Sequence, residues 1–116
     1  MKSYTDIEQS KKLAEILPLE SADCYWDYDE MQKFHRISWF EDGFNKESQL
    51  ILNENNVCAW SLAALLRELP ETILGKDKDG YVVMVETKGS GLTTFADEPV
   101  DACYEMIIKL YEQKIL

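Results

Sequence analysis

The residues best suited to nucleophilic chemistry are a single histidine and three cysteines. Any Cys–His or Ser–His pair must use His35, and no nucleophile-elbow pattern surrounds a candidate partner. Cys58 and Cys103 lie in apolar stretches that favour helix, where a thiol behaves as a small hydrophobic side chain with a raised pKa. The sequence therefore favours structural cysteines over a small hydrolase-like enzyme built on His35 and the Asp27/Asp29 group.

The segment 75–86 aligns in part with the calcium-binding loop of an EF-hand, with Asp77, Asp79 and Glu86 as the oxygen ligands. The first ligand position, however, holds Gly75. The residues after Tyr81 also have strand periodicity, whereas an EF-hand requires a helix there. We therefore expect an ordinary turn at Asp79 that leads into a strand, and no metal site.

Two further polar groupings are also expected to be structural. One is an acidic group without a recognised metal spacing, which predicts a solvated loop: Asp23, Asp27, Asp29 and Glu30. The other is the Gly-Ser-Gly segment 89–91, which lacks the lysine of a P-loop and lies between two expected strands, so it predicts a hairpin turn. No cofactor is expected.

Aromatic and acidic side chains are interleaved between residues 24 and 44, without helical spacing. Large aromatic residues with acids at their rim are typical of interface anchors. The candidate interaction residues are Tyr25, Trp26, Asp27, Tyr28, Asp29 and Trp39. The alternative, that these aromatic residues pack a sheet edge or cover the core, is equally consistent with the sequence.

The chain is strongly acidic, with a formal net charge of −10 at pH 7 and an isoelectric point near 4.5. This charge repels nucleic acid phosphates and anionic membrane surfaces, so neither is an expected partner. It also motivates a second hypothesis, in which the protein imitates nucleic acid and binds a basic host protein.

The 116 residues are enough for a single domain over 1–116 with its own core. Three widely spaced cysteines indicate neither a disulfide framework nor a zinc site. The N-terminus is polar and no apolar run is long enough to span a membrane. These features together predict a cytoplasmic protein.

The first elements are predicted from a helix-capping pattern and from the alternation of side chains along a strand. Thr5 and Glu8 fit a capping box, so a helix is expected over 6–17, ended by Pro18. Residues 33–40 alternate as a strand that ends at a turn over 41–43, and 49–52 could form its short partner.

The most apolar run, residues 57–70, is expected to form the central helix. Two starts are possible: Val57 after an asparagine cap, or Leu62 capped by Ser61 with Trp60 packed on Leu65. The second is preferred, which predicts a helix over 62–69 before Pro70.

Residues 81–95 are expected to form a β-hairpin, and Pro99 at a first helical position predicts a helix over 99–113. Two apolar stripes on that helix suggest a homodimer as a secondary hypothesis. The predicted fold is α+β, with a small antiparallel sheet (hairpin 81–95 plus the strand near 33–40) packed against helices 6–17, 62–69 and 99–113.

Three segments carry a family resemblance: 12–18 (KLAEILP), 59–70 (AWSLAALLRELP) and 96–107 (ADEPVDACYEMI). They resemble a family of small uncharacterised proteins of gut Bacteroides-type bacteria and their phage-like or mobile elements. The resemblance implies a compact α+β domain and brings no catalytic residue. The resulting hypothesis is a non-enzymatic protein-interaction or regulatory module, an accessory of a mobile element, with a protein partner.

Overall fold

The computed structural model describes residues 1–40, 55–87 and 89–116. In these ranges it contains three α-helices, one 3-10 turn and six strands. They are α1 (Ile7–Ala14), η1 (Leu19–Ser21), β1 (Cys24–Asp29), β2 (Phe34–Trp39), β3 (Val57–Ala59), α3 (Leu62–Glu68), β4 (Thr72–Asp77), β5 (Gly80–Thr87), β6 (Ser90–Ala96) and α4 (Pro99–Glu112). The predicted α+β class is confirmed.

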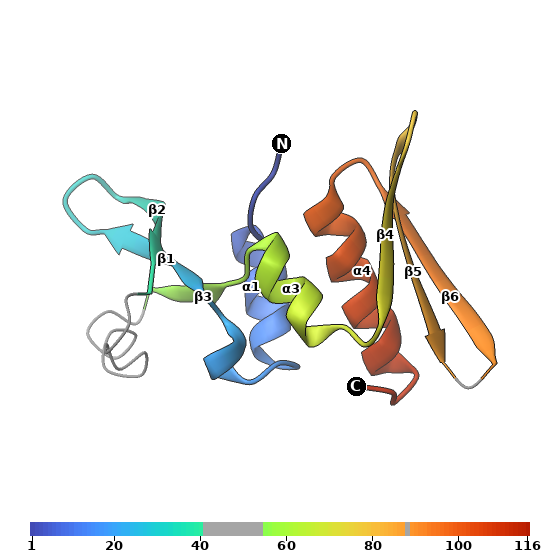
Figure 1. Ribbon diagram of the computed structural model, residues 1–116. Helices are drawn as coiled ribbons and strands as arrows, with labels where there is room; N and C mark the ends of the chain where they lie inside the picture. The colour runs from blue at the N-terminus through green and yellow to red at the C-terminus, as the bar shows by residue number, and fades with distance from the viewer. Residues whose placement is uncertain (41–54, 88) are drawn as a thin grey trace.

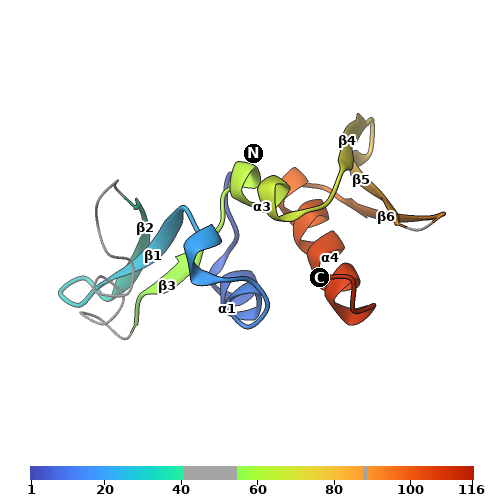
Figure 2. The ribbon, with the colours of Figure 1, turned by 60° about the horizontal axis from the view of Figure 1, so that its bottom comes forward.

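The described strands form two antiparallel three-stranded sheets where one was expected. We call β2-β1-β3 the N-terminal sheet and β4-β5-β6 the C-terminal sheet. They lie at opposite ends of an elongated molecule of 49 × 29 × 24 Å, with the helices between them (Figure 1). Figure 2 shows the same order of layers from a second direction. In the part of the chain described, no helix is long and apolar enough to cross a membrane.

Helix α1 uses a different cap from the one expected. The Asp6 carboxylate accepts from the Gln9 backbone N–H at 2.8 Å, and the Gln9 side chain accepts from the Asp6 N–H at 3.1 Å. Thr5, the predicted cap, is buried and its hydroxyl accepts from the Trp60 backbone N–H. The predicted cap was wrong because a tertiary contact uses the Thr5 hydroxyl. The helix also ends earlier than predicted, at Ala14.

The N-terminal sheet is centred on β1, a strand that the aromatic pattern did not predict. Strand β2, close to its predicted bounds, pairs with β1 so that Cys24 lies opposite Trp39 and Asp29 opposite Phe34. On its other side β1 pairs with β3. The short partner expected at 49–52 lies outside the described residues.

The central apolar run divides into a strand and a helix. Residues 57–59 form β3, so Cys58 lies in a strand and not in a helix. Helix α3 then begins at Leu62, and the Ser61 hydroxyl accepts from the Ala64 N–H at 3.2 Å, which confirms the preferred start. Trp60, between the two, is fully buried in the core.

The C-terminal sheet and α4 form the other half of the core. The predicted hairpin is confirmed as β5–β6, and β4 adds a strand that was not expected. Pro99 lies in the first turn of α4, as predicted. Val83 and Val85 are buried in the same core cluster as Met106 and Ile107 of α4, so α4 covers one face of this sheet (Figure 1).

Candidate functional site

The six predicted interaction residues lie in the N-terminal sheet, but they do not form one cluster. Because side chains alternate along a strand, Trp26 and Tyr28 of β1 share a face with Trp39 of β2, opposite Cys24 in the register. Tyr25, Asp27 and Asp29 project from the other face. Each face therefore carries only part of the predicted surface.

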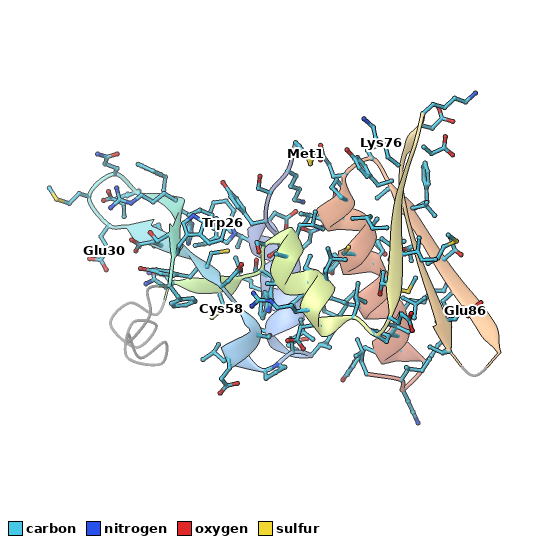
Figure 3. All side chains as sticks on the ribbon, in the orientation of Figure 1. Met1, Trp26, Glu30, Cys58, Lys76 and Glu86 are labelled. Carbon is cyan, nitrogen blue, oxygen red and sulfur yellow. The ribbon has the colours of Figure 1, made fainter. Side chains whose placement is uncertain are left out.

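Two of these residues, Trp26 and Tyr25, are held by side-chain contacts within the chain. The Trp26 indole donates to the Thr5 carbonyl at 3.0 Å, and its ring meets Tyr4 edge-on with centroids 5.5 Å apart. Tyr25 packs on Phe40 with a centroid distance of 4.8 Å. Figure 3 shows Trp26 near the helices and Glu30 at the tip of the β1–β2 hairpin.

Tyr28 and Asp29 also have defined partners. The Tyr28 backbone N–H donates to the Asn56 side chain at 2.9 Å, and its ring lies 4.9 Å from that of His35. Asp29 accepts from the backbone N–H groups of Met31 and Gln32, which orders the turn before β2. Trp39 differs from the others, because 53% of its surface is exposed.

Among the described residues, His35 lies beside Tyr28 and Asn55. Its Nε2 lies 3.0 Å from the Asn55 carbonyl, and it is opposite Tyr28 in the register. Cys24 lies on the same sheet face as His35. It is four residues along β1 from Tyr28, the residue opposite His35, which is about 13 Å at ~3.3 Å per residue. Burial raises the pKa of the Cys24 thiol, and the negative charge of the nearby Asp23 raises it further. The thiol is therefore a poor partner for His35.

The other cysteines are buried as well. Burial raises the pKa of Cys103 to about 11, which disfavours the reactive thiolate at neutral pH. Among the residues that the structure describes, no group of three or more His, Cys, Asp or Glu side chains is placed to hold a metal.

The residues of the EF-hand-like segment belong to a hairpin. Asp77 pairs with Gly80 across a turn at residues 78 and 79, and Glu86 is at the other end of β5, opposite Gly91. Asp79 and Glu86 are seven positions apart along the extended chain, which is about 23 Å at ~3.3 Å per residue. These acids cannot surround one ion, and the turn expected at Asp79 is confirmed.

A polar cluster joins the N-terminal residues to α1 and α4. The Lys2 ammonium donates to Asp101 at 2.7 Å, to Gln9 at 2.9 Å and to Asp6 at 3.2 Å. Burial alone would lower the pKa of Lys2, but the Asp101 and Asp6 carboxylates outweigh it and raise that pKa. Through Lys2 and Gln9 the cluster links the N-terminal segment and the start of α1 to α4.

A further surface, which the sequence analysis missed, lies on the C-terminal sheet. The side chains that alternate with the buried Val83 and Val85 face away from α4, and we call this side of the sheet the outer face. Its members are Ile73, Gly75, Asp77, Val82, Met84, Glu86, Gly91, Thr93 and Phe95. No described helix or strand covers it (Figure 1).

The outer face exposes large apolar side chains. The exposed fractions are 63% for Ile73, 50% for Phe95 and 41% for Met84. Ile73 lies opposite Met84, and Val82 lies opposite Phe95 in the next row of the same face. The apolar residues are therefore neighbours across three strands. One sequence signal was available: residues 81–85 are apolar at both alternating positions, as in a strand with two covered faces.

One end of the outer face is hollowed. An open depression of about 380 Å³ is lined by Ile73, Met84 and Gly91 together with the acidic residues Glu71 and Glu86, and Thr93, Val85 and Leu92 complete it. A Cβ added at Gly91 would meet nothing within 4 Å, so the floor there is open. This arrangement can receive an apolar side chain with a cation beside it.

Comparisons with known proteins identify no relative. No family model matches the sequence, and no match was found among the curated proteins or the solved structures. The family resemblance of the three segments therefore stays a prediction.

Proposed function

We propose that the protein is a non-enzymatic interaction module that binds a partner protein through the outer face of its C-terminal sheet. The observation that carries the proposal is the exposure of Ile73, Met84 and Phe95 as neighbours on a sheet face that no described element covers. Contiguous apolar patches on a protein surface mark interaction sites, whereas isolated exposed apolar residues do not.

The outer face of the C-terminal sheet carries apolar side chains where a solvated face would carry polar ones. A half-solvated antiparallel sheet normally alternates apolar residues toward the core with polar residues toward water. Here β5 carries Val83 and Val85 toward α4 but also Val82 and Met84 on the outer face. A second covering layer would bury these side chains, which supports a bound partner.

Selective loss of one bound protein tests the proposal. We expect wild-type protein to retain a discrete partner from a lysate of its native host, and Ile73→Ser/Met84→Ser to lose it. The matched control is Met31→Ser/Ile115→Ser, which replaces exposed apolar residues away from this sheet. Equal recovery by wild type and by the Ile73/Met84 variant would reject the outer face as the binding site.

Trp39 supports a second candidate surface on the N-terminal sheet. It is 53% exposed and shares its face with Trp26 and Tyr28. If this face binds the partner, Trp39→Ala will lose the same protein in the capture experiment while Ile73→Ser/Met84→Ser retains it.

Several related hypotheses stay predictions: the cytoplasmic location, the origin in a mobile element and the imitation of nucleic acid. The homodimer through α4 is also untested. Most of its two apolar stripes are used within the chain, because Tyr104 and Ile108 pack against the core while Tyr111 and Ile115 are exposed. The outer face therefore offers more uncovered apolar surface than α4 does.

A further inference from the structure

We infer that the partner segment recognised by the outer face is a basic amphipathic helix, with an apolar stripe flanked by lysine or arginine. This inference rests on the proposed function and specifies the chemistry of the partner. It follows from the charges that border the apolar residues of the C-terminal sheet.

The charged side chains of the outer face are acidic. Glu71 and Glu86 lie at one end of the face, beside Ile73 and Met84, and Asp77 lies at the other end of β4. Among the described residues of these strands, the one lysine is Lys76, which projects from the α4 side and lies 6.0 Å from the Tyr81 ring. In the β4–β5 turn Lys78 directly follows Asp77, so a cationic partner would meet carboxylates chiefly at the end with Glu71 and Glu86.

These carboxylates are available for intermolecular pairing. Glu71 and Glu86 are exposed, and neither forms an ion pair with another described residue. Figure 3 shows Glu86 at the end of the molecule opposite Glu30. Pairing with lysine or arginine at the rim would add specificity to the burial of Ile73 and Met84 beside it.

The shape of the sheet favours a helix as the bound element. On the opposite face, α4 already packs its apolar stripe against β5 and β6. The outer face offers a comparable row of apolar side chains over three strands, so a second helix would complete a three-layer arrangement. The depression near Gly91 would receive one apolar side chain of that helix, next to the cations that pair with Glu71 and Glu86.

A second copy of the chain does not fit these charges. Each copy carries a net charge of −10. A symmetric contact between two outer faces would bring like-charged carboxylates together along with the apolar residues. The charge pattern therefore selects a basic partner over self-association.

Binding of defined peptides tests the inference. The probes are three fluorescein-labelled helical peptides of about 18 residues, which span ~27 Å as helices. The first has a leucine stripe flanked by lysine and arginine, the second has the same stripe flanked by glutamine, and the third keeps the cations but replaces the leucines with serine. We expect the first to bind wild-type protein most tightly by fluorescence anisotropy.

Matched variants separate local pairing from net charge. Glu71→Gln/Glu86→Gln is expected to weaken binding of the first peptide about three- to tenfold, since exposed ion pairs contribute modestly. Glu8→Gln/Glu15→Gln removes the same charge from exposed positions on and beside α1 and is expected to leave binding unchanged. Equal weakening by the two variants, or no binding of the first peptide, would overturn the inference.

The apolar variant distinguishes this inference from the proposed function. Ile73→Ser/Met84→Ser is expected to weaken the first peptide by about tenfold or more. If the glutamine-flanked peptide binds as tightly as the basic one and still requires Ile73 and Met84, the basic partner is rejected while the outer face stands as a binding site. If the Ile73/Met84 variant binds like wild type, both proposals fail for this surface.

Discussion

At the scale of single residues, Trp60 joins three parts of the chain. Its backbone N–H donates to the Thr5 hydroxyl at 3.1 Å, and its carbonyl accepts from the Thr5 N–H at 2.9 Å. Its indole N–H donates to the Ser21 hydroxyl at 2.8 Å. The side chain itself is fully buried. This one residue therefore fixes the N-terminal segment, η1 and the start of α3 together.

Replacement of Trp60 should accordingly be severe. Trp60→Ala is expected to lower the free energy of unfolding by about 3–5 kcal/mol, because it leaves a cavity and removes the hydrogen bond from the indole to the Ser21 hydroxyl. Urea denaturation followed by circular dichroism measures the change. Trp39→Ala, at a half-exposed tryptophan, is the control and should cost well under that amount. Similar losses for both variants would contradict the central role of Trp60.

The ion pair of Lys2 and Asp101 predicts a pH dependence. Burial alone would raise the pKa of Asp101, but hydrogen bonds from Lys2 and Gln9 outweigh it and lower that pKa below its ordinary value of 3.8. Ionised Asp101 therefore stabilises the fold above pH 3.8, and this contribution is lost as pH falls through the lower folded-state pKa.

Asp101→Asn tests this dependence. At pH 7 it is expected to reduce the free energy of unfolding by less than about 1 kcal/mol, because the pair is partly exposed. The difference between wild type and variant should shrink as the pH falls below the ordinary pKa. Chemical denaturation at a series of pH values measures it, with Asp97→Asn as an exposed control. A difference that stays constant into acid would refute the assigned role.

At the scale of elements, the β4–β5 turn depends on Gly80. Its φ of +153° is a conformation that residues with a side chain rarely adopt. A Cβ there would also lie 2.6 Å from the Ala96 carbonyl oxygen of β6. The close approach of the β5 and β6 backbones explains why β5 begins with glycine.

Gly80→Ala should therefore destabilise the C-terminal sheet. We expect a loss of about 1–3 kcal/mol in the free energy of unfolding, from backbone strain and the clash with β6. Gly91→Ala is a matched comparison in the same sheet, since its added Cβ meets nothing within 4 Å. Thermal unfolding by calorimetry distinguishes the two. Equal stability of the two variants would mean that β6 moves away at little cost.

At the scale of the whole molecule, the two sheets differ in how they are supported. The C-terminal sheet packs Val83 and Val85 into the main core with α4. The strands β1 and β2 project away from the helices, and Phe34 and Trp39 of β2 are exposed (Figure 1). Stability should consequently vary along the long axis of the protein.

Hydrogen exchange should reveal this gradient. Amides of β5 and α4 are expected to exchange slowest, because their hydrogen bonds open only when the core unfolds. Hydrogen-bonded amides of β2 should exchange faster, through local opening of the hairpin. Mass spectrometry of proteolytic fragments, at a pH where exchange reports the opening equilibrium, measures both. Slower exchange in β2 than in β5 would contradict this picture.

Elements whose signals lie within a few residues were predicted correctly from the sequence. Ser61 as a cap predicted the start of α3, Pro99 predicted the start of α4, and the Gly-Ser-Gly segment 89–91 predicted the β5–β6 hairpin. These signals succeed because caps, proline geometry and tight turns are local interactions.

The distribution of the strands between two sheets, and the identity of the uncovered surface, depend on long-range packing. Strand β3 was missed because its partner β1 is distant in sequence, with Tyr25 opposite Cys58, and the Thr5 cap failed because the Trp60 N–H donates to that hydroxyl. Strands β1 and β4 were missed although they form hairpins with β2 and β5. The outer face, too, could be identified only from the packing of the elements. Residues 81–85 are apolar on both sides, but only the packing of α4 on one side shows that Val82 and Met84 are left without a covering layer.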